Sequence, residues 1–357
     1  MLLALRPTAH RVAVHTAVQL GHAGSQVTLR PNDRALQTML SRLHRGELRV
    51  DLEDRLRTEF PDRWPELSAD LDRLIAADVV RSIATTRAVT DRHSRTRTFL
   101  SQFADQDIDE DELLGRIRRS TITVVGVGGL GSWILHGLIG LGVARLRLAD
   151  FDVVEESNLN RSSLFEPGDI GTPKIAAARR AVRRGNPDID VDVVPIDLAR
   201  GPLPATAVAD ADLVISTADK PPWQARREVA TACVAADVPF LCPAGYRVGP
   251  FHLGPGTACV MCELDEMLDC RPGAAAAMEA MATIPASEPG SVPHIAASAA
   301  SVALAEVLWH LSGVAQPNTV NRIWTADGSL AARYVDRPPY SGCSTCSRPA
   351  RAYPPAL

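Results

Sequence analysis

Two pairs of cysteines with the same spacing are the first candidates for chemistry in this sequence. Cys259 and Cys262 form one Cys-x-x-Cys motif, and Cys343 and Cys346 form a second one far downstream. Each motif supplies two thiolates from one tight turn, and four thiolates make a tetrahedral site for Zn²⁺. Because four protein ligands leave no open coordination position, we expect a structural zinc that fixes the C-terminal segment to the preceding domain. Two redox-active pairs are the alternative, and these would require exposure and helix N-termini.

A glycine-rich loop is the second candidate. An apolar strand runs directly into Gly126, Gly128, Gly129 and Gly131, and a helix is expected to begin there. Such glycines let the backbone approach a phosphate, and the helix N-terminus adds free N–H groups and the positive end of a dipole. Taken alone, the motif is most typical of an NAD or FAD site. Asp150, about twenty residues further on, suits a ribose hydroxyl in NAD and ATP sites alike.

The residues that follow distinguish an ATP site from a dinucleotide site. Asn158, Arg161 and Lys174 lie downstream of the first half of the predicted nucleotide fold, and Lys174 is one of two lysines among 38 basic residues, with Lys220. A dehydrogenase does not need two cations there. A triphosphate carries about four negative charges, and the release of pyrophosphate requires their stabilisation. The sequence therefore favours ATP.

Strands that alternate with helices must position these groups. The expected strands are 121–127, 144–150, 191–196, 212–218 and 238–244. Alternation at this spacing predicts an α/β fold with a doubly wound, Rossmann-like, mostly parallel sheet. Asp219 directly follows the fourth strand, at the carboxyl edge where ligands bind in such sheets. An acid at that edge is suited to hold Mg²⁺ against the phosphates.

A separate small domain precedes this sheet. Its first part alternates apolar and polar residues, as hairpin strands do, and helical periodicity begins after the capping residue Asp33. The expected strands are 11–19, 26–29 and 79–83, and the expected helices lie between Asp33 and Gly46, over 51–60 and over 65–77. A small sheet with three short helices is a winged-helix-like α+β pattern.

Three regions result from this division. Residues 1–88 form the winged-helix-like domain, the polar residues 89–118 form a linker with an arginine segment, and residues 119–357 form the nucleotide-binding domain with the cysteine motifs. The Pro- and Ala-rich stretch 271–293 is expected to be a long crossover or lid loop.

Composition excludes several classes of protein. With 46% hydrophobic and 22% charged residues, the chain is globular rather than disordered. No run of apolar residues reaches the length of a membrane span, and Arg6 interrupts the apolar start too early for a signal peptide. We therefore expect a cytoplasmic protein without a membrane partner. A net charge of −4 gives no electrostatic reason to bind nucleic acid.

The motifs together resemble a known family. The strings GVGGLGS, ADFDVVEESNLNR, GTPK and STAD are similar to those of the ThiF/MoeB superfamily, adenylating enzymes related to the ubiquitin-activating enzymes, over about residues 90–346. The resemblance implies that Asp150 holds the ribose and that Asn158, Arg161 and Lys174 contact the phosphates. It also implies that Asp219 binds Mg²⁺ and that the four cysteines bind zinc.

The same resemblance implies a homodimer. The segment from Arg92 to Arg95 is similar to an arginine segment through which family members reach the nucleotide of the other subunit, so Arg95 is the candidate and Arg97 its rival. Members that transfer the acyl group to a thiol carry a cysteine near the end of the crossover loop. Residues 285–295 contain none, which leaves Cys270 as the alternative for a covalent role.

The N-terminal domain resembles the PqqD-like peptide clamp of peptide-modifying enzymes. A clamp followed by an adenylating domain is similar to the microcin C-type peptide adenylyltransferases. This implies antibiotic-type peptide biosynthesis, with adenylation at the C-terminus of a ribosomally made precursor peptide whose leader adds to an exposed strand edge over 26–29. Later steps could include formation of a P–N bond, a cyclisation or transfer to a downstream modifying enzyme. A DNA-binding winged helix is disfavoured, because acids are interspersed among its bases.

Two other functions remain open from the sequence. In one, the chain recruits a leader peptide for a partner enzyme and its nucleotide site is vestigial. In the other, the chain activates a sulfur-carrier protein.

Overall fold

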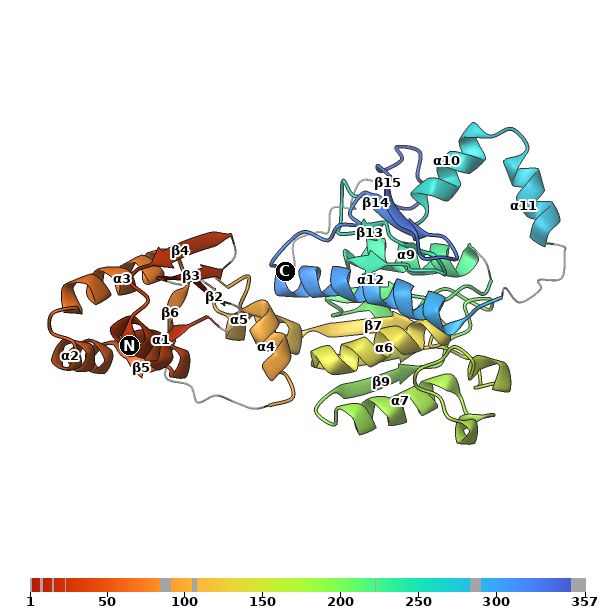
Figure 1. Cartoon of the computed structure of the whole chain (residues 1–357). Helices are drawn as coiled ribbons and strands as arrows, with labels where there is room; N and C mark the ends of the chain where they lie inside the picture. Colours follow the sequence, from red (N-terminus) through yellow and green to blue (C-terminus); the bar gives the residue numbers. More distant parts are fainter. Residues whose placement is uncertain are drawn as a thin grey trace, which may run out of the picture. The chain divides into compact units, whose positions relative to one another are not determined.

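The computed structural model describes residues 2–6, 9–14, 16–22, 24–83, 91–104, 108–221, 223–282 and 290–347 (Figure 1). The chain divides into two compact units, Met1–Leu114 and Gly115–Leu357.

The N-terminal unit combines three helices with two small antiparallel sheets. One sheet has the order β5-β1-β6 and the other β2-β3-β4. The strands are β1 (Leu2–Leu5), β2 (His10–Val14), β3 (Ala17–His22), β4 (Ser25–Leu29), β5 (Glu47–Leu48) and β6 (Val80–Ile83), and the helices are α1 (Arg34–Arg45), α2 (Arg49–Glu59) and α3 (Trp64–Ala76). The predicted α+β content is therefore present.

Two details of this unit differ from the prediction. The expected strand over 11–19 is two strands, because the chain turns back at Thr16 and Val14 pairs with Ala17. β1 was not expected, since four apolar residues at the chain start carry no alternation; it pairs with β5 and β6.

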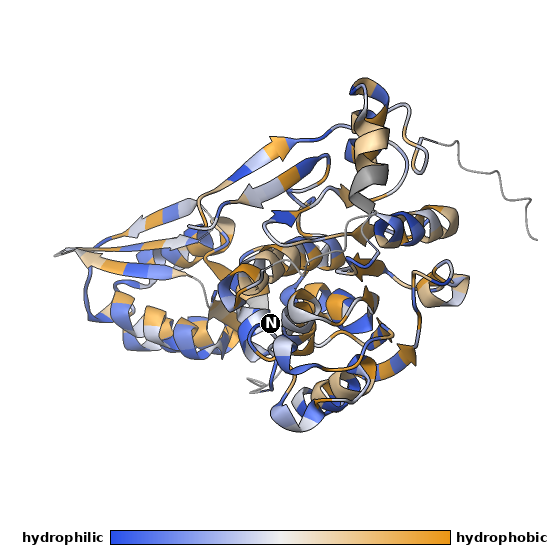
Figure 2. Cartoon of the chain, turned by 90° about the vertical axis from the view of Figure 1, so that its right-hand side faces the viewer, coloured by the Kyte–Doolittle hydropathy of each residue, from blue (hydrophilic) through white to orange (hydrophobic). Residues whose placement is uncertain are grey.

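Helix α1 shows how local residues determine where a helix begins, which side it buries and where it ends. The carboxylate of Asp33 accepts a hydrogen bond from Leu36 N (2.9 Å), which caps the first turn. Leu36, Met39 and Leu43 are buried on one side, and the helix ends at Gly46 with φ of 76°. The blue and orange bands along the helices in Figure 2 reflect this division into polar and apolar faces.

The C-terminal unit is built on a six-stranded sheet of order β13-β11-β10-β7-β8-β9. All neighbouring strands run parallel except β11 and β13. The strands are β7 (Thr121–Val125), β8 (Arg145–Ala149), β9 (Asp190–Val194), β10 (Leu213–Ser216), β11 (Phe240–Leu241) and β13 (Phe251–His252), and the connecting helices are α6 (Gly129–Leu141), α7 (Lys174–Gly185), α8 (Ala205–Val208) and α9 (Gln224–Ala236). The five predicted strands and the mostly parallel, doubly wound sheet are confirmed.

The rest of this unit follows the sheet in sequence. It comprises α10 (Cys262–Cys270), α11 (Ala274–Ala282), α12 (Pro293–Ser312) and a small antiparallel sheet of β12 (Arg247–Val248), β14 (Arg322–Ala326) and β15 (Ala332–Asp336). The expectation of a long loop over 271–293 is wrong in part, because α11 lies within it. Residues 283–289 of that stretch lie outside the described residues.

By its length and composition alone, helix α12 could cross a membrane. It nevertheless packs against α6, and a Cβ at Gly137 of α6 would collide with the side chain of Leu304. Its one acid, Glu306, is buried and accepts hydrogen bonds from Thr319 N and Oγ1, both 3.0 Å. These contacts are those of a core helix.

The arginine segment belongs to the N-terminal unit. It forms α4 (Ser94–Leu100), and the following helix α5 (Glu110–Arg119) crosses the boundary between the units. Arg6 is 3% exposed; its guanidinium donates to Ser101 O (2.9 Å), just after α4, and to the carboxylate of Asp78 (2.6 Å). Arg81 pairs with Glu110 at the start of α5.

Candidate active site

The predicted nucleotide residues gather where the strand order of the large sheet reverses. From β7 the chain builds β8 and β9 on one side, and then returns to place β10 and β11 on the other. The loops that leave β7 and β10 therefore diverge at their carboxyl ends, which is the usual ligand crevice of an open parallel sheet. The glycine loop follows β7, and Asp219 lies just beyond β10.

Two of the glycines are required by the packing of the loop itself. Gly126 has φ of 86°, and a Cβ there would lie 2.7 Å from Ala218 N. A Cβ at Gly131 would lie inside contact distance of Gly126 O, and Thr217 Oγ1 donates to that same oxygen (2.8 Å). The start of α6 can pack this close to β10 only because both positions lack a side chain.

The other two glycines face different surroundings. Gly128 is the N-cap of α6, and a Cβ there would meet nothing within 4 Å among the described residues. A Cβ at Gly129 would lie 2.8 Å from Arg161 Cγ. The backbone at the start of α6 is thus open at Gly128, where a phosphate can approach its N–H groups, and is covered at Gly129 by the stem of Arg161.

Asp150 fixes the glycine loop to the end of β8. Its Oδ2 accepts from Val127 N (2.6 Å) and its Oδ1 from Asp152 N (2.8 Å). Burial raises the pKa of this carboxyl, which the two N–H donors oppose. The carboxylate is therefore in place beside the loop, as a ribose-binding acid must be, and also orders the loop.

Lys174 is paired with an acid that the sequence did not single out. Lys174 is the first residue of α7, and its Nζ lies 2.8 Å from Asp152 Oδ2. Asp152 follows Asp150 by two positions and lies outside the site residues that the sequence motifs indicate. The pairing was hidden because segments 152–154 and 171–174 are joined by antiparallel hydrogen bonds that no local pattern reveals.

Asn158 and Arg161 lie in the loop after β8, and the stem of Arg161 is next to Gly129. Asn158 is buried at the end of a 3-10 turn, Glu156–Asn158, and its Oδ1 accepts from Glu155 N (3.1 Å). Arg161 donates through one terminal nitrogen to Ser157 O (2.6 Å) and Asn160 Oδ1 (3.0 Å). Its carbonyl accepts from Trp133 Nε1 (2.9 Å) of α6, which ties this loop to the helix behind the glycines.

Asp219 is exposed two residues beyond Thr217. Its carboxylate makes no hydrogen bond or ion pair with any residue that the structure describes, so it is available to a ligand. The donor type suits Mg²⁺, which prefers one or two carboxylates together with substrate phosphates.

The two rival arginines of α4 differ in what they bind. Arg97 donates Nε to Asp111 (2.6 Å) and its terminal nitrogens to Asp91 (3.3 and 3.4 Å). Arg95 is exposed and has no hydrogen bond or ion pair within the described part of the chain. Arg97 is thus committed to structure within its own unit, whereas Arg95 is available.

The four cysteines of the two motifs converge in the C-terminal unit. Their Sγ atoms all lie within 4.8 Å of one another, with separations of 3.7 Å (Cys259 to Cys343) and 3.4 Å (Cys262 to Cys346) among them. A tetrahedron with Zn–S bonds of about 2.3 Å places sulfurs about 3.8 Å apart. The donor set and its spacing fit such an ion.

The remaining cysteines lie apart from this cluster. Cys233 and Cys242 are buried in the core, and burial raises the pKa of both thiols, that of Cys242 to about 12. Cys270 is exposed at the end of α10.

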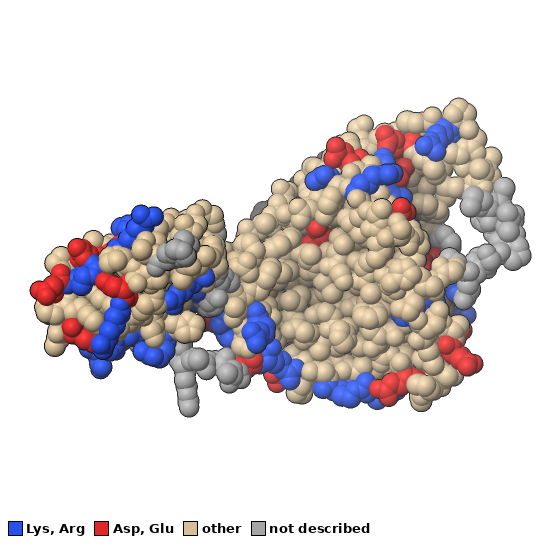
Figure 3. Space-filling view, in the orientation of Figure 1, with Lys and Arg blue, Asp and Glu red and all other residues tan. Residues whose placement is uncertain are grey.

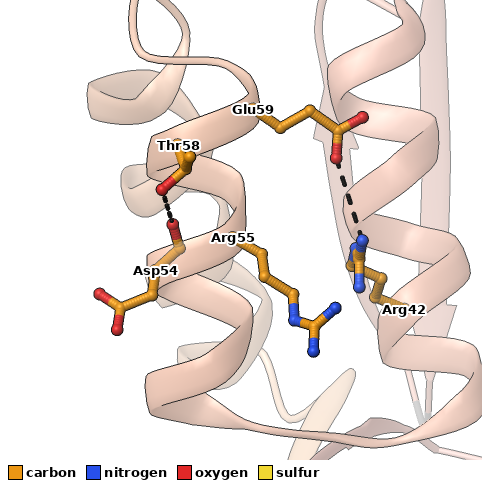
Figure 4. A pocket seen from close by; sticks show the side chains of 5 residues that line it. All are labelled: Arg42, Asp54, Arg55, Thr58 and Glu59. Atoms are coloured by element: carbon orange, nitrogen blue, oxygen red, sulfur yellow. Dashed lines mark hydrogen bonds and ion pairs between the residues drawn. The ribbon is translucent and has the colours of Figure 1, made fainter.

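A cavity of about 500 Å³ lies elsewhere, in the N-terminal unit between α1 and α2 (Figure 4). Its lining residues are Arg42, Asp54, Arg55, Thr58 and Glu59. Arg42 pairs with Glu47 and Glu59, and Arg55 pairs with Glu47. The positive charges that line the cavity are therefore compensated by acids. None of the predicted site residues lines this cavity.

Comparison with known proteins agrees with this geometry. A family model described as ThiF family matches residues 99–345. The molybdopterin-synthase adenylyltransferase of Escherichia coli (strain K12) is 35% identical over 160 residues, which are 44% of this chain and 62% of that protein. The sulfur carrier protein ThiS adenylyltransferase of Bacillus subtilis (strain 168) is 32% identical over 158 residues, 43% of this chain and 46% of that protein. The chain thus spans roughly half the length of these relatives.

Solved structures match over nearly the whole chain. E. coli MccB with ATP has a TM-score of 0.72 at 18% identity, covering 97% of this chain and 100% of that one. The doubly wound sheet with its glycine loop defines a Rossmann-like α/β protein. Since the family model covers more than half of the sequence, the chain belongs to the ThiF family, as its motifs predicted.

Proposed function

We propose that this protein is an ATP-dependent adenylyltransferase that transfers AMP to a carboxylate. The observation that carries the proposal is the convergence of the open glycine loop, Asp150, Lys174 and Asp219 at one sheet edge. The names of the related adenylyltransferases support it. A hydride-transfer reaction would have no use for the ammonium of Lys174 at this edge.

The proposed reaction needs positioning and charge rather than a protein nucleophile. A carboxylate oxygen of the substrate attacks the α-phosphorus of ATP and forms a new P–O bond. The bond from that phosphorus to the bridging oxygen breaks, and pyrophosphate leaves. Lys174, Arg161 and the N–H groups at Gly128 would stabilise the charge that accumulates on the phosphates. Asp219 would hold Mg²⁺, which neutralises part of that charge.

The favoured substrate is the C-terminus of a precursor peptide. β4 is an edge strand of the β2-β3-β4 sheet, and α3 lies beside it, with Arg73 donating to Thr28 O (3.0 Å). An extended leader can add to such an edge through backbone hydrogen bonds. The likeness to the microcin C7 biosynthetic enzyme MccB, solved in complex with MccA, supports a peptide.

Activation of a sulfur-carrier protein is the second candidate, because relatives with that named activity match part of this chain. Exposed Cys270 is the thiol that such a pathway would use. Two measurements separate the candidates: adenylation of a precursor peptide that is lost when the leader is removed supports the first, and a thiocarboxylate product that is lost in Cys270→Ser supports the second.

ATP–pyrophosphate exchange tests the adenylation itself. Lys174→Ala should lower the exchange rate about 100-fold, because a cation at the phosphates is lost. Arg183→Ala, an exposed arginine on the same helix, is the matched control and should keep the wild-type rate. Wild-type protein that binds a peptide tightly by calorimetry, but neither binds ATP nor supports exchange, would instead be a recruiting subunit.

We also propose a structural Zn²⁺ at Cys259, Cys262, Cys343 and Cys346, since the sulfur spacing fits a closed tetrahedral site. Removal of the metal with a chelator should lower the melting temperature, because binding stabilises only the folded state. Elemental analysis that finds no zinc in purified protein, together with a melting curve unchanged by the chelator, would refute this assignment.

A homodimer completes the proposal. α6 contains no Asp, Glu, Lys or Arg, and the one such residue of α12, Glu306, is buried. In Figure 3 the face of the C-terminal unit over these two helices is mostly uncharged. Such a face is suited to a second copy of the chain. The dimer would let Arg95 of one subunit reach the nucleotide of the other.

A further inference from the structure

Lys174 poses an electrostatic problem when no nucleotide is bound. Its side chain is 11% exposed, and it begins α7, where the helix dipole presents its positive end. An ammonium largely withdrawn from water at such a position requires an anion close by. The carboxylate of Asp152, 2.8 Å away, is that anion.

Backbone hydrogen bonds hold Asp152 from both directions. Its N–H donates to Asp150 Oδ1 (2.8 Å), and its carbonyl accepts from Lys174 N (2.8 Å). Asp150 in turn accepts from Val127 N of the glycine loop (2.6 Å). A continuous series of hydrogen bonds therefore connects the glycine loop to the ammonium of Lys174.

The two partners differ in their access to solvent. The side chain of Asp152 is 37% exposed, more than three times the fraction of Lys174. A phosphate group that approaches the ammonium from solvent therefore meets a carboxylate already bound to it. The two anions compete for one cation and repel each other.

We propose that Asp152 takes the place of a nucleotide phosphate at Lys174 in the free protein, and that ATP displaces it from the ammonium on binding. Asp152 is then a positioning residue. It holds the Lys174 side chain in the conformation that receives the phosphate, and it weakens the binding of nucleotide. This inference rests on the proposed ATP site.

Calorimetry with two ligands tests the proposal. Asp152→Asn removes the charge and keeps an oxygen that can accept from Nζ. The variant should bind ATP about two- to fivefold more tightly than the wild type, which is the effect of one partly exposed charge pair. Adenosine, which lacks phosphates, should bind both proteins equally. Asp190→Asn, an exposed acid on β9, is the matched control and should leave both affinities unchanged.

Unchanged or weaker ATP binding in Asp152→Asn overturns the proposal. A parallel loss of adenosine binding would indicate a purely structural role. If the wild type itself fails to bind ATP, the proposed function fails instead. Should Asp152→Asn be too unstable to purify, Asp152→Ser carries the same prediction.

Labelling of amines provides a second readout that does not need nucleotide. Without ATP, Lys174 should react faster with an amine reagent in Asp152→Asn than in the wild type, because its partner has lost its charge. Lys220, the second lysine of the chain, is the internal control in the same digest. Equal reactivity of Lys174 in the two proteins would contradict the proposal.

Discussion

Among the four glycines of the proposed nucleotide site, Gly131 has the least space for a side chain. Its missing side chain lets α6 pack against Gly126 O, which Thr217 also binds. A methyl group must push apart two backbone segments, and neither is a flexible side chain. The added methyl group would therefore distort the backbone of the glycine loop.

We expect Gly131→Ala to abolish ATP binding and to lower the free energy of unfolding by about 1–3 kcal/mol. Gly140→Ala is the control on the same helix, because a Cβ there meets nothing within 4 Å. That variant should be neutral or slightly stabilising. Calorimetry and chemical denaturation measure the two effects, and normal ATP binding by Gly131→Ala would contradict the packing argument.

Glu306 gives a prediction about pH. Burial raises the pKa of this carboxyl in the folded protein. At a pH below the ordinary pKa of Glu, both states are protonated and the penalty is absent. As the pH rises through the raised value, the folded state must ionise a buried group, and stability falls.

Glu306→Gln removes this ionisation. The free energy of unfolding of the variant, relative to the wild type, should therefore increase as the pH rises from 5 to 8. Urea denaturation at several pH values measures the difference. A difference that stays constant with pH would mean that Glu306 titrates normally.

At the scale of elements, one buried arginine fastens α4 to the small domain. Arg6 donates to Ser101 O at the end of α4 and to Asp78 after α3. Arg6→Ala should destabilise the protein by about 1.5–3 kcal/mol, since charged hydrogen bonds at a buried site are lost. Arg45→Ala, an exposed arginine of α1, should change stability little. Equal denaturation midpoints for the two variants would exclude this role.

The elements that could be predicted are those with a local signal. The parallel strands are runs of apolar residues bounded by loops, and α1 has a capping acid and a terminal glycine. β1 was missed because its four residues carry no local strand pattern. They form a strand only through their pairing with β5 and β6. α11 was missed because alanines between prolines resemble a loop.

The site residues divide in the same way. Asp150, Lys174 and the glycines lie in motifs, so the sequence alone was enough to propose them as site residues. Asp152 was missed because its partner is 22 positions away. The sequence leaves Arg95 and Arg97 as rivals, because Asp111 approaches Arg97 only when α4 and α5 have folded.

The proposed dimer makes a prediction at the scale of the whole molecule. If Arg95 acts on the partner's nucleotide, Arg95→Ala and Lys174→Ala damage different parts of the same composite site. Each variant alone should be inactive in pyrophosphate exchange. An equal mixture that exchanges subunits should recover about a quarter of the wild-type rate, because half of the dimers are mixed and each has one intact site.

A mixture that stays inactive although mixed dimers form would place Arg95 outside the partner's site. Analytical ultracentrifugation with Ala305→Glu, which adds a charge to the exposed side of α12, tests the proposed contact face independently. We expect that variant to be a monomer.

The cysteine cluster also has a consequence for which insertions the chain can accept during evolution. The sulfurs of Cys262 and Cys343 lie within 4.8 Å of each other, so the proposed zinc would close the chain between them into a loop anchored at one point. The entropy cost of closing a loop grows only logarithmically with its length, by about 0.6 kcal/mol for each doubling. Insertions between α11 and α12 are therefore thermodynamically cheap. The length of that stretch can therefore vary during evolution while the six-stranded sheet stays as it is.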